Sequence, residues 1–93
     1  MKYFDWDKDK NEFLKQERDI CFEEALMAIE EGNILDIVEN PNVAKYPYQQ
    51  IFIIKINNYA YLVPFAEDKQ KVFLKTIIPS RKATKKYIIK LKI

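Results

Sequence analysis

Three strand-like segments in the second half of the chain limit most strongly what it can fold into. Residues 50–56, 59–66 and 71–78 are rich in Ile, Val, Phe, Tyr and Thr, which favour β-strands. Only Asn57-Asn58 separates the first two segments, and Asn accepts the positive φ that a two-residue hairpin turn requires. Residues 67–70 turn the second hairpin. The sequence therefore predicts an antiparallel meander of three strands.

Hairpin geometry also predicts the register of this meander. The two-residue turn pairs Ile56 with Tyr59, and the next turn pairs Val63 with Leu74. Pro64 has no amide proton to donate, so we expect it to mark a bulge in the middle strand. This register fixes which side chains share each face of the sheet.

Both faces of the predicted sheet are largely apolar, so both need at least partial cover by other elements. Two lysines, Lys55 and Lys75, interrupt one face, which also carries Ile77. We expect the N-terminal helices on the other face, and a ligand nearer to the lysines.

Two helices and a fourth strand are predicted before the meander. Asp7 is a suitable N-cap for a helix over residues 8–18. Residues 22–31 repeat apolar side chains three and four positions apart, as a helix with one buried face does. Gly32 suits the left-handed position that follows such a helix, and the apolar residues of 34–39 favour a strand.

A short basic helix is predicted after the last strand. Pro79 ends the β-rich run, and Ser80 is a good N-cap for a helix from Arg81 to about Lys90. This helix start brings cations and open backbone donors to the end of a strand, which suits a phosphate group. The predicted fold is α+β: one small domain over residues 1–93, with an antiparallel sheet of about four strands, two N-terminal helices and the basic C-terminal helix.

Charge divides the chain into an acidic half and a basic half. Residues 1–44 hold five Lys/Arg against twelve Asp/Glu, a net charge of −7, and residues 45–93 hold eleven against two, a net charge of +9. From Lys69 to Ile93 there are nine cations and no acid. Solubility does not require this much uncompensated charge. It predicts a surface for a polyanion or an acidic partner.

Several function classes are excluded by what the sequence lacks. It has no histidine, which rules out Ser-His-Asp and Cys-His nucleophilic systems and histidine-based metal sites. Its one glycine rules out Walker and dinucleotide-binding loops, and its one cysteine rules out an internal disulfide. The sequence has no apolar run near the ~20 residues of a membrane helix and no apolar signal-peptide core. We therefore expect a cytoplasmic protein without metal, cofactor or membrane contact.

Three motifs follow one another along nearly the whole chain. They are Phe4-Asp5-Trp6-Asp7, Cys21-Phe22-Glu23-Glu24-Ala25 and Ile77-Ile78-Pro79-Ser80-Arg81-Lys82-Ala83-Thr84. Together they resemble the BrnT-type toxins of type II toxin-antitoxin systems, whose pattern is F-x-W-D, then F-E-E-A, then I-I-S-A-R-x-A-T. The resemblance implies a RelE/ParE-like fold and ribonuclease activity on mRNA. It also implies a cognate ribbon-helix-helix antitoxin that neutralises the toxin and represses the operon, so that operator DNA is reached only through the antitoxin.

The chain departs from the family pattern at two places. The lysine-histidine-glycine stretch before F-E-E-A is replaced by residues 16–19, and the Glu-Arg pair before the second strand is replaced around Gln49-Gln50. These two departures from the family pattern weaken the inference of catalytic activity more than the inference of the fold.

Cleavage of RNA by its own 2′-hydroxyl needs a proton acceptor and cations against the charge that develops on the phosphate. Arg81 matches the arginine of the last motif, and its planar fork can bind two phosphate oxygens. Lys75 and Lys85 are the other catalytic candidates. The predicted RNA-binding residues are Lys45, Tyr46, Tyr48, Lys82, Lys86 and Trp6.

Simpler roles remain open for these residues. Arg81 can be an ordinary exposed residue at a helix start. Tyr46 and Tyr48 can be plain loop aromatics, and Trp6 can belong to the core. Two other functions also fit the sequence: a ParE-like protein that blocks a protein target, and a non-catalytic RNA-binding module.

Overall fold

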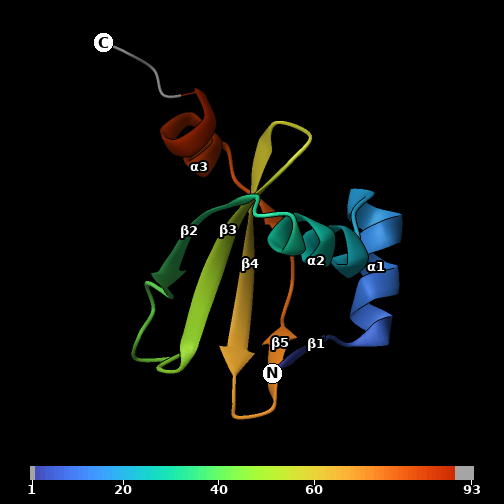
Figure 1. Ribbon diagram of the computed structural model, residues 1–93, viewed down its shortest axis with the longest axis vertical. Helices are drawn as coiled ribbons and strands as arrows, with labels where there is room; N and C mark the ends of the chain where they lie inside the picture. The colour runs from blue at the N-terminus through green and yellow to red at the C-terminus, as the bar shows by residue number, and fades with distance from the viewer. Residues whose placement is uncertain (1, 90–93) are drawn as a thin grey trace.

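The computed structural model describes residues 2–89, which form a small compact α+β domain around one mixed sheet (Figure 1). Along the chain the elements are β1 (Tyr3–Asp5), α1 (Lys8–Arg18), α2 (Phe22–Glu30), β2 (Ile34–Glu39), β3 (Gln49–Ile56), β4 (Tyr59–Glu67), β5 (Lys71–Leu74), β6 (Ile78–Pro79), α3 (Arg81–Ala83) and η1 (Thr84–Ile89). The strand order is β1-β5-β4-β3-β2, and β6 also pairs with β4. None of the helices in this part of the chain is long and apolar enough to cross a membrane.

The number and pairing of the strands differ from the predicted sheet of about four antiparallel strands. β1 pairs in parallel with β5, and β6 adds two residues beside β4. Strands of three and two residues are too short for their sequence to identify a partner strand. Their pairing depends on contacts that are distant in the sequence. The observed sheet therefore has six strands and contains one parallel pair.

The bounds predicted for α1 are confirmed, and both ends of the helix are capped. Asp7 accepts a hydrogen bond from the amide of Asp9 at 2.9 Å. Asp19 ends the helix in the left-handed conformation, with φ of 53°. α2 ends one residue earlier than predicted, and Gly32 follows it with φ of 81°.

A side chain from α1 caps the start of α2. The buried Asn11 accepts a hydrogen bond from the amide of Phe22 at 2.7 Å and donates one to Glu23 at 2.8 Å. Cys21, at the N-cap position, makes no such bond with its side chain. The two helices are therefore joined by a polar contact as well as by packing.

α1 and α2 cover one face of the sheet and form the main core with it. Leu14 and Phe22 are wholly buried there against Ile54 and Val63. Trp6 packs at the edge of this cluster and stacks on Phe22, with ring centroids 5.6 Å apart. The prediction that the N-terminal helices share one face of the sheet agrees with this packing.

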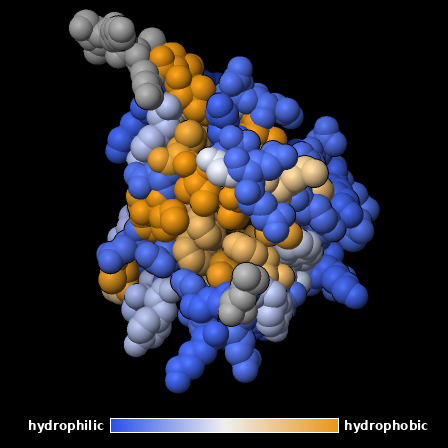
Figure 2. Space-filling model, viewed as in Figure 1, coloured by the Kyte–Doolittle hydropathy of each residue, from blue (hydrophilic) through white to orange (hydrophobic). Residues whose placement is uncertain are grey.

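The C-terminal helix, formed by α3 and η1, covers part of the opposite face. Ala83 is buried against Ile53 and Ala60, and Tyr87 packs beside them. Figure 2 shows apolar residues that extend from this helix down over the strands. Both faces of the sheet are thus covered at least in part, as their apolar character predicted.

The register of the first hairpin is confirmed, and that of the second is wrong. Ile56 pairs with Tyr59, at a tip where both Asn residues have positive φ. Leu74, however, pairs with Phe65 rather than with Val63. The longer turn after β4 does not fix the register, because several loop lengths are compatible with the same four polar residues.

The predicted last strand, residues 71–78, breaks at residues 75–77. Pro64 accepts a hydrogen bond from the amide of Lys75 at 2.8 Å but has no N–H to return, so the ladder cannot continue beside it. β4 itself pairs with β3 through Pro64 without a bulge. The prediction of a bulge in the middle strand at Pro64 is therefore wrong, and the irregular backbone lies at residues 75–77.

Because of this break, the side chain of Ile77 points to the face of the sheet opposite to the predicted one. We expected Ile77 on the face that carries the lysines, but it is wholly buried in the core under the helices. The register of β6 against β4 is shifted by one residue from that of β5, and such a shift exchanges the two faces. Arg18 donates a hydrogen bond to the carbonyl of Ile77 at 2.7 Å and holds the segment in place.

Candidate nucleic-acid interface

Ser80 fixes the start of the C-terminal helix to the sheet. Its hydroxyl accepts a hydrogen bond from the amide of Ala83 at 3.1 Å, and its own amide donates to the carbonyl of Ala60 at 3.0 Å. Its backbone is extended, as is usual for an N-cap residue. The capping role predicted for Ser80 is therefore confirmed, and the cap also joins the helix to β4.

Thr84 adds a second link, which the sequence analysis missed. Its buried hydroxyl donates to the carbonyl of Ser80 at 2.7 Å and accepts from the amide of Ala60 at 2.9 Å. Both backbone groups of Ala60 are thus bonded to the helix start. The signal for this role was the spacing of two hydroxyl residues four positions apart, with the small Ala83 between them.

The exposed side of this helix carries four cations, which we call the basic cluster: Arg81, Lys82, Lys85 and Lys86. The ion pairs found in residues 2–89 join Lys2 with Glu67, Lys15 with Glu12 and Lys71 with Asp5. In that part of the chain the basic cluster has no carboxylate partner. Among the described residues, none of the four cations is held in a direct ion pair, and the carboxylate close enough to interact with the charge of Lys86 is that of Asp36.

Tyr87 ties the helix to β2. Its hydroxyl donates to the carboxylate of Asp36 at 2.8 Å. This hydrogen bond is the largest cause of the lowered pKa of Asp36. A hydrogen bond from the amide of Ile37 and the nearby charge of Lys86 lower that pKa further. Asp36 therefore stays ionised beside the basic cluster, and its carboxylate accepts from Tyr87.

Lys75, another of the catalytic candidates, is hydrogen-bonded further along β4 than the start of the C-terminal helix. The amide of Lys75 donates a hydrogen bond to the carbonyl of Pro64, whereas the amide of Ser80, at the helix start, donates to the carbonyl of Ala60. Four residues of strand separate these two points, about 13 Å at the usual rise. The ammonium group of Lys75 lies 5.0 Å from the ring centroid of Phe73. Lys75 and Arg81 can therefore contact the same phosphate only if both side chains extend towards each other.

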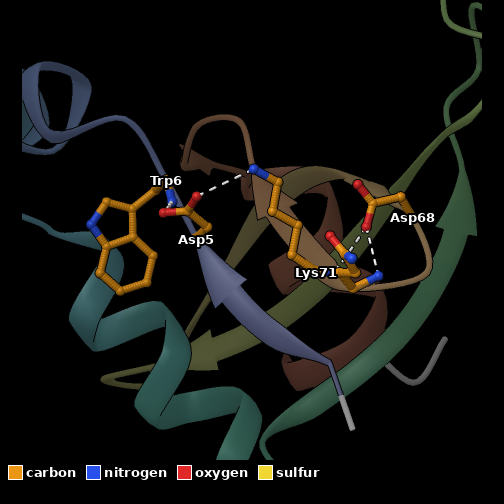
Figure 3. A network of polar contacts seen from close by, with 5 residues as sticks. Asp5, Trp6, Asp68 and Lys71 are labelled. Carbon is orange, nitrogen blue, oxygen red and sulfur yellow. Dashed lines mark hydrogen bonds and ion pairs between the residues drawn. The ribbon is translucent and has the colours of Figure 1, made fainter.

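Trp6 is half-buried against the main core and does not belong to the basic cluster. Its ring stacks on Phe22 of α2, and Figure 3 shows it turned towards that helix. Its amide donates to the carboxylate of Asp5 at 2.9 Å, and that carboxylate also contacts Lys71 at 3.5 Å (Figure 3). The alternative interpretation of Trp6 as a core residue fits this packing.

Lys45, Tyr46 and Tyr48 lie at the other end of the sheet from the basic cluster. They belong to the connection between β2 and β3, which is at the opposite end from the β3-β4 hairpin and the C-terminal helix (Figure 1). The ammonium group of Lys45 is 5.3 Å from the ring centroid of Tyr46. Tyr48 is 89% exposed.

A groove of about 540 Å³ opens beside this connection. Residues 39–50 form one side of it, and the turn between β4 and β5 forms the other together with Lys2. The turn is held by Asp68, which accepts hydrogen bonds from the amides of Gln70 at 2.8 Å and Lys71 at 2.9 Å (Figure 3). These bonds lower the pKa of Asp68.

A smaller hollow of about 260 Å³ lies between α2 and the β3-β4 turn and includes Met27 and Lys55. Neither hollow is lined by Arg81, Lys75 or Lys85. The three catalytic candidates are exposed on the surface instead.

Metal and thiol chemistry have little support in the described residues. Within residues 2–89, no three His, Cys, Asp or Glu side chains gather as a metal ion would need. Burial raises the pKa of the Cys21 thiol, whose sulfur donates to Glu24 at 3.4 Å. Cys21 is therefore protonated at neutral pH and is a poor nucleophile.

The structure brings together four of the nine predicted site residues, those of the basic cluster. Lys75 lies further along β4 from them, Lys45, Tyr46 and Tyr48 lie at the far end of the sheet, and Trp6 packs half-buried against the main core. No protein-family model, curated protein or solved structure matches this chain. Its function must therefore be argued from the geometry and charge of these surfaces.

Proposed function

We propose that this protein is the toxin of a type II toxin-antitoxin module, with a RelE/ParE-like fold, and that it binds and cleaves mRNA without a metal ion. The observation that carries the proposal is the basic cluster, four exposed cations on a helix that hydrogen bonds attach to β4. Phosphate contacts supply most of the non-specific affinity for nucleic acid. Cations that are fixed on a helix and form no ion pair with a carboxylate can contact the phosphates of an RNA backbone.

In the proposed reaction the RNA supplies its own nucleophile. The 2′-oxygen attacks the adjacent phosphorus, the bond from phosphorus to the 5′-oxygen breaks, and a cyclic phosphate and a 5′-hydroxyl end are formed. Arg81 binds two phosphate oxygens and opposes the charge that develops on them. Lys85 and Lys75 are the candidates for the group that accepts the 2′-hydroxyl proton, and the leaving 5′-oxygen gains a proton from solvent.

A non-catalytic function is the second candidate, as a ParE-like inhibitor of a protein target or as an RNA-binding module. It is favoured by the open position of the catalytic candidates, since neither hollow includes Arg81, Lys75 or Lys85. A reaction that needs in-line attack gains much of its rate from fixed geometry. An exposed surface holds the reacting groups less firmly than a cleft does.

The proposal includes an antitoxin of the ribbon-helix-helix type, which would neutralise the toxin in the cytoplasm and carry it to operator DNA. The charge of the described surface suits an acidic region of such a partner, because the basic cluster has no carboxylate partner in residues 2–89. Antitoxin and RNA would then compete for the same cations.

The experiment that tests the proposal is expression of the protein alone in bacteria, with mRNA cleavage followed by primer extension. We expect growth arrest and cleaved mRNA with the unchanged chain. Arg81→Ala should restore growth and lower cleavage by purified protein at least about 100-fold, as the loss of a group that stabilises the transition state does. Lys8→Ala, which removes an exposed cation from α1, is the matched control.

Three outcomes separate the candidates. Cleavage that persists in EDTA and depends on Arg81 supports the ribonuclease. Growth arrest without cleaved mRNA supports the non-catalytic candidate. Undiminished cleavage by the Arg81→Ala protein contradicts the role proposed for Arg81.

A further inference from the structure

We infer that the groove between residues 39–50 and the β4-β5 turn, here called the loop groove, binds an unpaired nucleobase of single-stranded RNA. This inference rests on the proposed function and assigns base recognition to a site away from the basic cluster. The groove volume of about 540 Å³ lies in the range of small-molecule sites. Tyr48, which lines it, is 89% exposed and can present its ring to a base.

The loop beside the groove is held in place by its own hydrogen bonds. Asn42 donates its amide to the side chain of Asn40 at 3.0 Å and accepts the amide of Tyr46 at 2.9 Å on its carbonyl. The side chain of Asn40 donates to that of Gln49 at 3.1 Å. Binding therefore does not have to order this loop first, which lowers the entropic cost of binding.

The charges of the loop groove favour a base over a phosphate. Three carboxylates line it, those of Glu39, Glu67 and Asp68, against two cations, Lys2 and Lys69, and the excess of negative charge disfavours a phosphate. Two of these carboxylates are engaged, Glu67 with Lys2 at 2.6 Å and Asp68 with backbone amides. Such a mixed lining suits a neutral ligand.

The hydrogen-bonding groups of the groove fit the edge of a base. Gln50 lines the groove, and its side chain makes no hydrogen bond within residues 2–89. It offers one donor group and one acceptor, and Gln49 keeps a donor group after its oxygen is taken by Asn40. A base edge presents both donors and acceptors, whereas an arginine side chain presents donors only. The lining can therefore match the donors and acceptors of a base edge.

The two sites lie far enough apart to require a strand of several nucleotides. The basic cluster is attached at Ala60 and the groove reaches Glu67 of the same strand. Seven residues of β4 span about 23 Å. One RNA strand that crosses the sheet can therefore contact both sites, and a dinucleotide cannot.

The test is fluorescence anisotropy with labelled homopolymers of A, U and C of about 12 nucleotides, a length within the range of known single-strand sites. Tyr48→Ala should weaken binding about fivefold or more without changing the salt dependence, because it removes stacking and no charge. Tyr48→Phe should keep the wild-type affinity. Gln50→Leu should change the order of preference among the three polymers, and Lys86→Ala should lower the salt dependence while keeping that order.

The outcomes distinguish this inference from the proposed function. RNA binding that depends on Lys86 but is the same in Tyr48→Ala overturns the nucleobase site and leaves the proposed function standing. Failure of all three polymers to bind overturns both. An arginine-rich peptide that binds in a Tyr48-dependent manner, where RNA does not, assigns the loop groove to a protein partner and also overturns the inference. Unchanged urea midpoints show that each variant is folded.

Discussion

Different interactions attach the helices to the two faces of the sheet. Under α1 and α2, wholly buried side chains such as Leu14, Phe22 and Ile54 form a continuous apolar core. On the other face the C-terminal helix buries the small Ala83 and depends on hydrogen bonds through Thr84. The first face supplies most of the stability, and the second holds a charged surface in place. Substitutions should separate these two contributions.

The largest loss of stability is expected on the helix-covered face. Phe22→Ala should lower the free energy of unfolding by about 3–5 kcal/mol, because it removes a buried ring and leaves a cavity. Phe13→Ala, on the neighbouring helix, removes a ring that is 47% exposed and should cost much less. Urea denaturation measures both. Equal losses would show that the apolar core is not confined to this face.

A smaller loss is expected at the anchor of the C-terminal helix. Thr84→Val leaves the buried amide of Ala60 without its acceptor and should lower the free energy of unfolding by about 1–3 kcal/mol. RNA affinity should fall as well, because the basic cluster loses part of its attachment. Thr76→Val, at a half-buried threonine, is the control for stability. An unchanged urea midpoint in Thr84→Val would contradict the anchoring role.

The smallest effect is expected from Tyr87→Phe, and it should depend on pH. The pKa of Asp36 is lowered in the folded protein, chiefly by the hydrogen bond from Tyr87. The resulting stabilisation is present above the unfolded-state pKa and is lost as the pH falls through the folded-state pKa. Tyr87→Phe should therefore be less stable than the wild type at neutral pH and nearly equal to it in strong acid.

Urea midpoints measured across the acidic range test this prediction. Tyr59→Phe serves as the control, because it removes a hydroxyl elsewhere and its effect should not vary with pH. A Tyr87→Phe difference that stays constant from neutral to strongly acidic pH would show that the Asp36 bond does not contribute.

The sequence predicts the parts of the fold that local chemistry determines. The cap at Asp7 fixes the start of α1, and the tight turn at Asn57-Asn58 fixes the first hairpin. Residues 75–77 could not be predicted in the same way. Their path depends on the missing N–H of Pro64 in a neighbouring strand and on a hydrogen bond from Arg18, both distant in the sequence. The pairing of β1 with β5 and of β6 with β4 was not predicted, because strands of three and two residues do not fix a partner.

The site was predicted less completely than the fold. Residues close in sequence to Ser80 do lie together, because one helix carries them. Tyr48 was assigned to RNA binding by residue type, and Trp6 also by its match to the first motif. Tyr48 lies at the other end of the sheet, and Trp6 packs against the main core. Thr84 was missed because its spacing from Ser80 does not by itself show that its hydroxyl is buried against a strand.

The salt dependence of RNA binding tests the central claim most directly. A single-stranded RNA of about 12 nucleotides should bind the wild type with a logarithmic slope near −3, if each cation of the basic cluster contacts one phosphate. Replacing Arg81, Lys82, Lys85 and Lys86 together with alanine should bring the slope close to zero and leave the urea midpoint unchanged. Equal slopes for the two proteins would contradict the account.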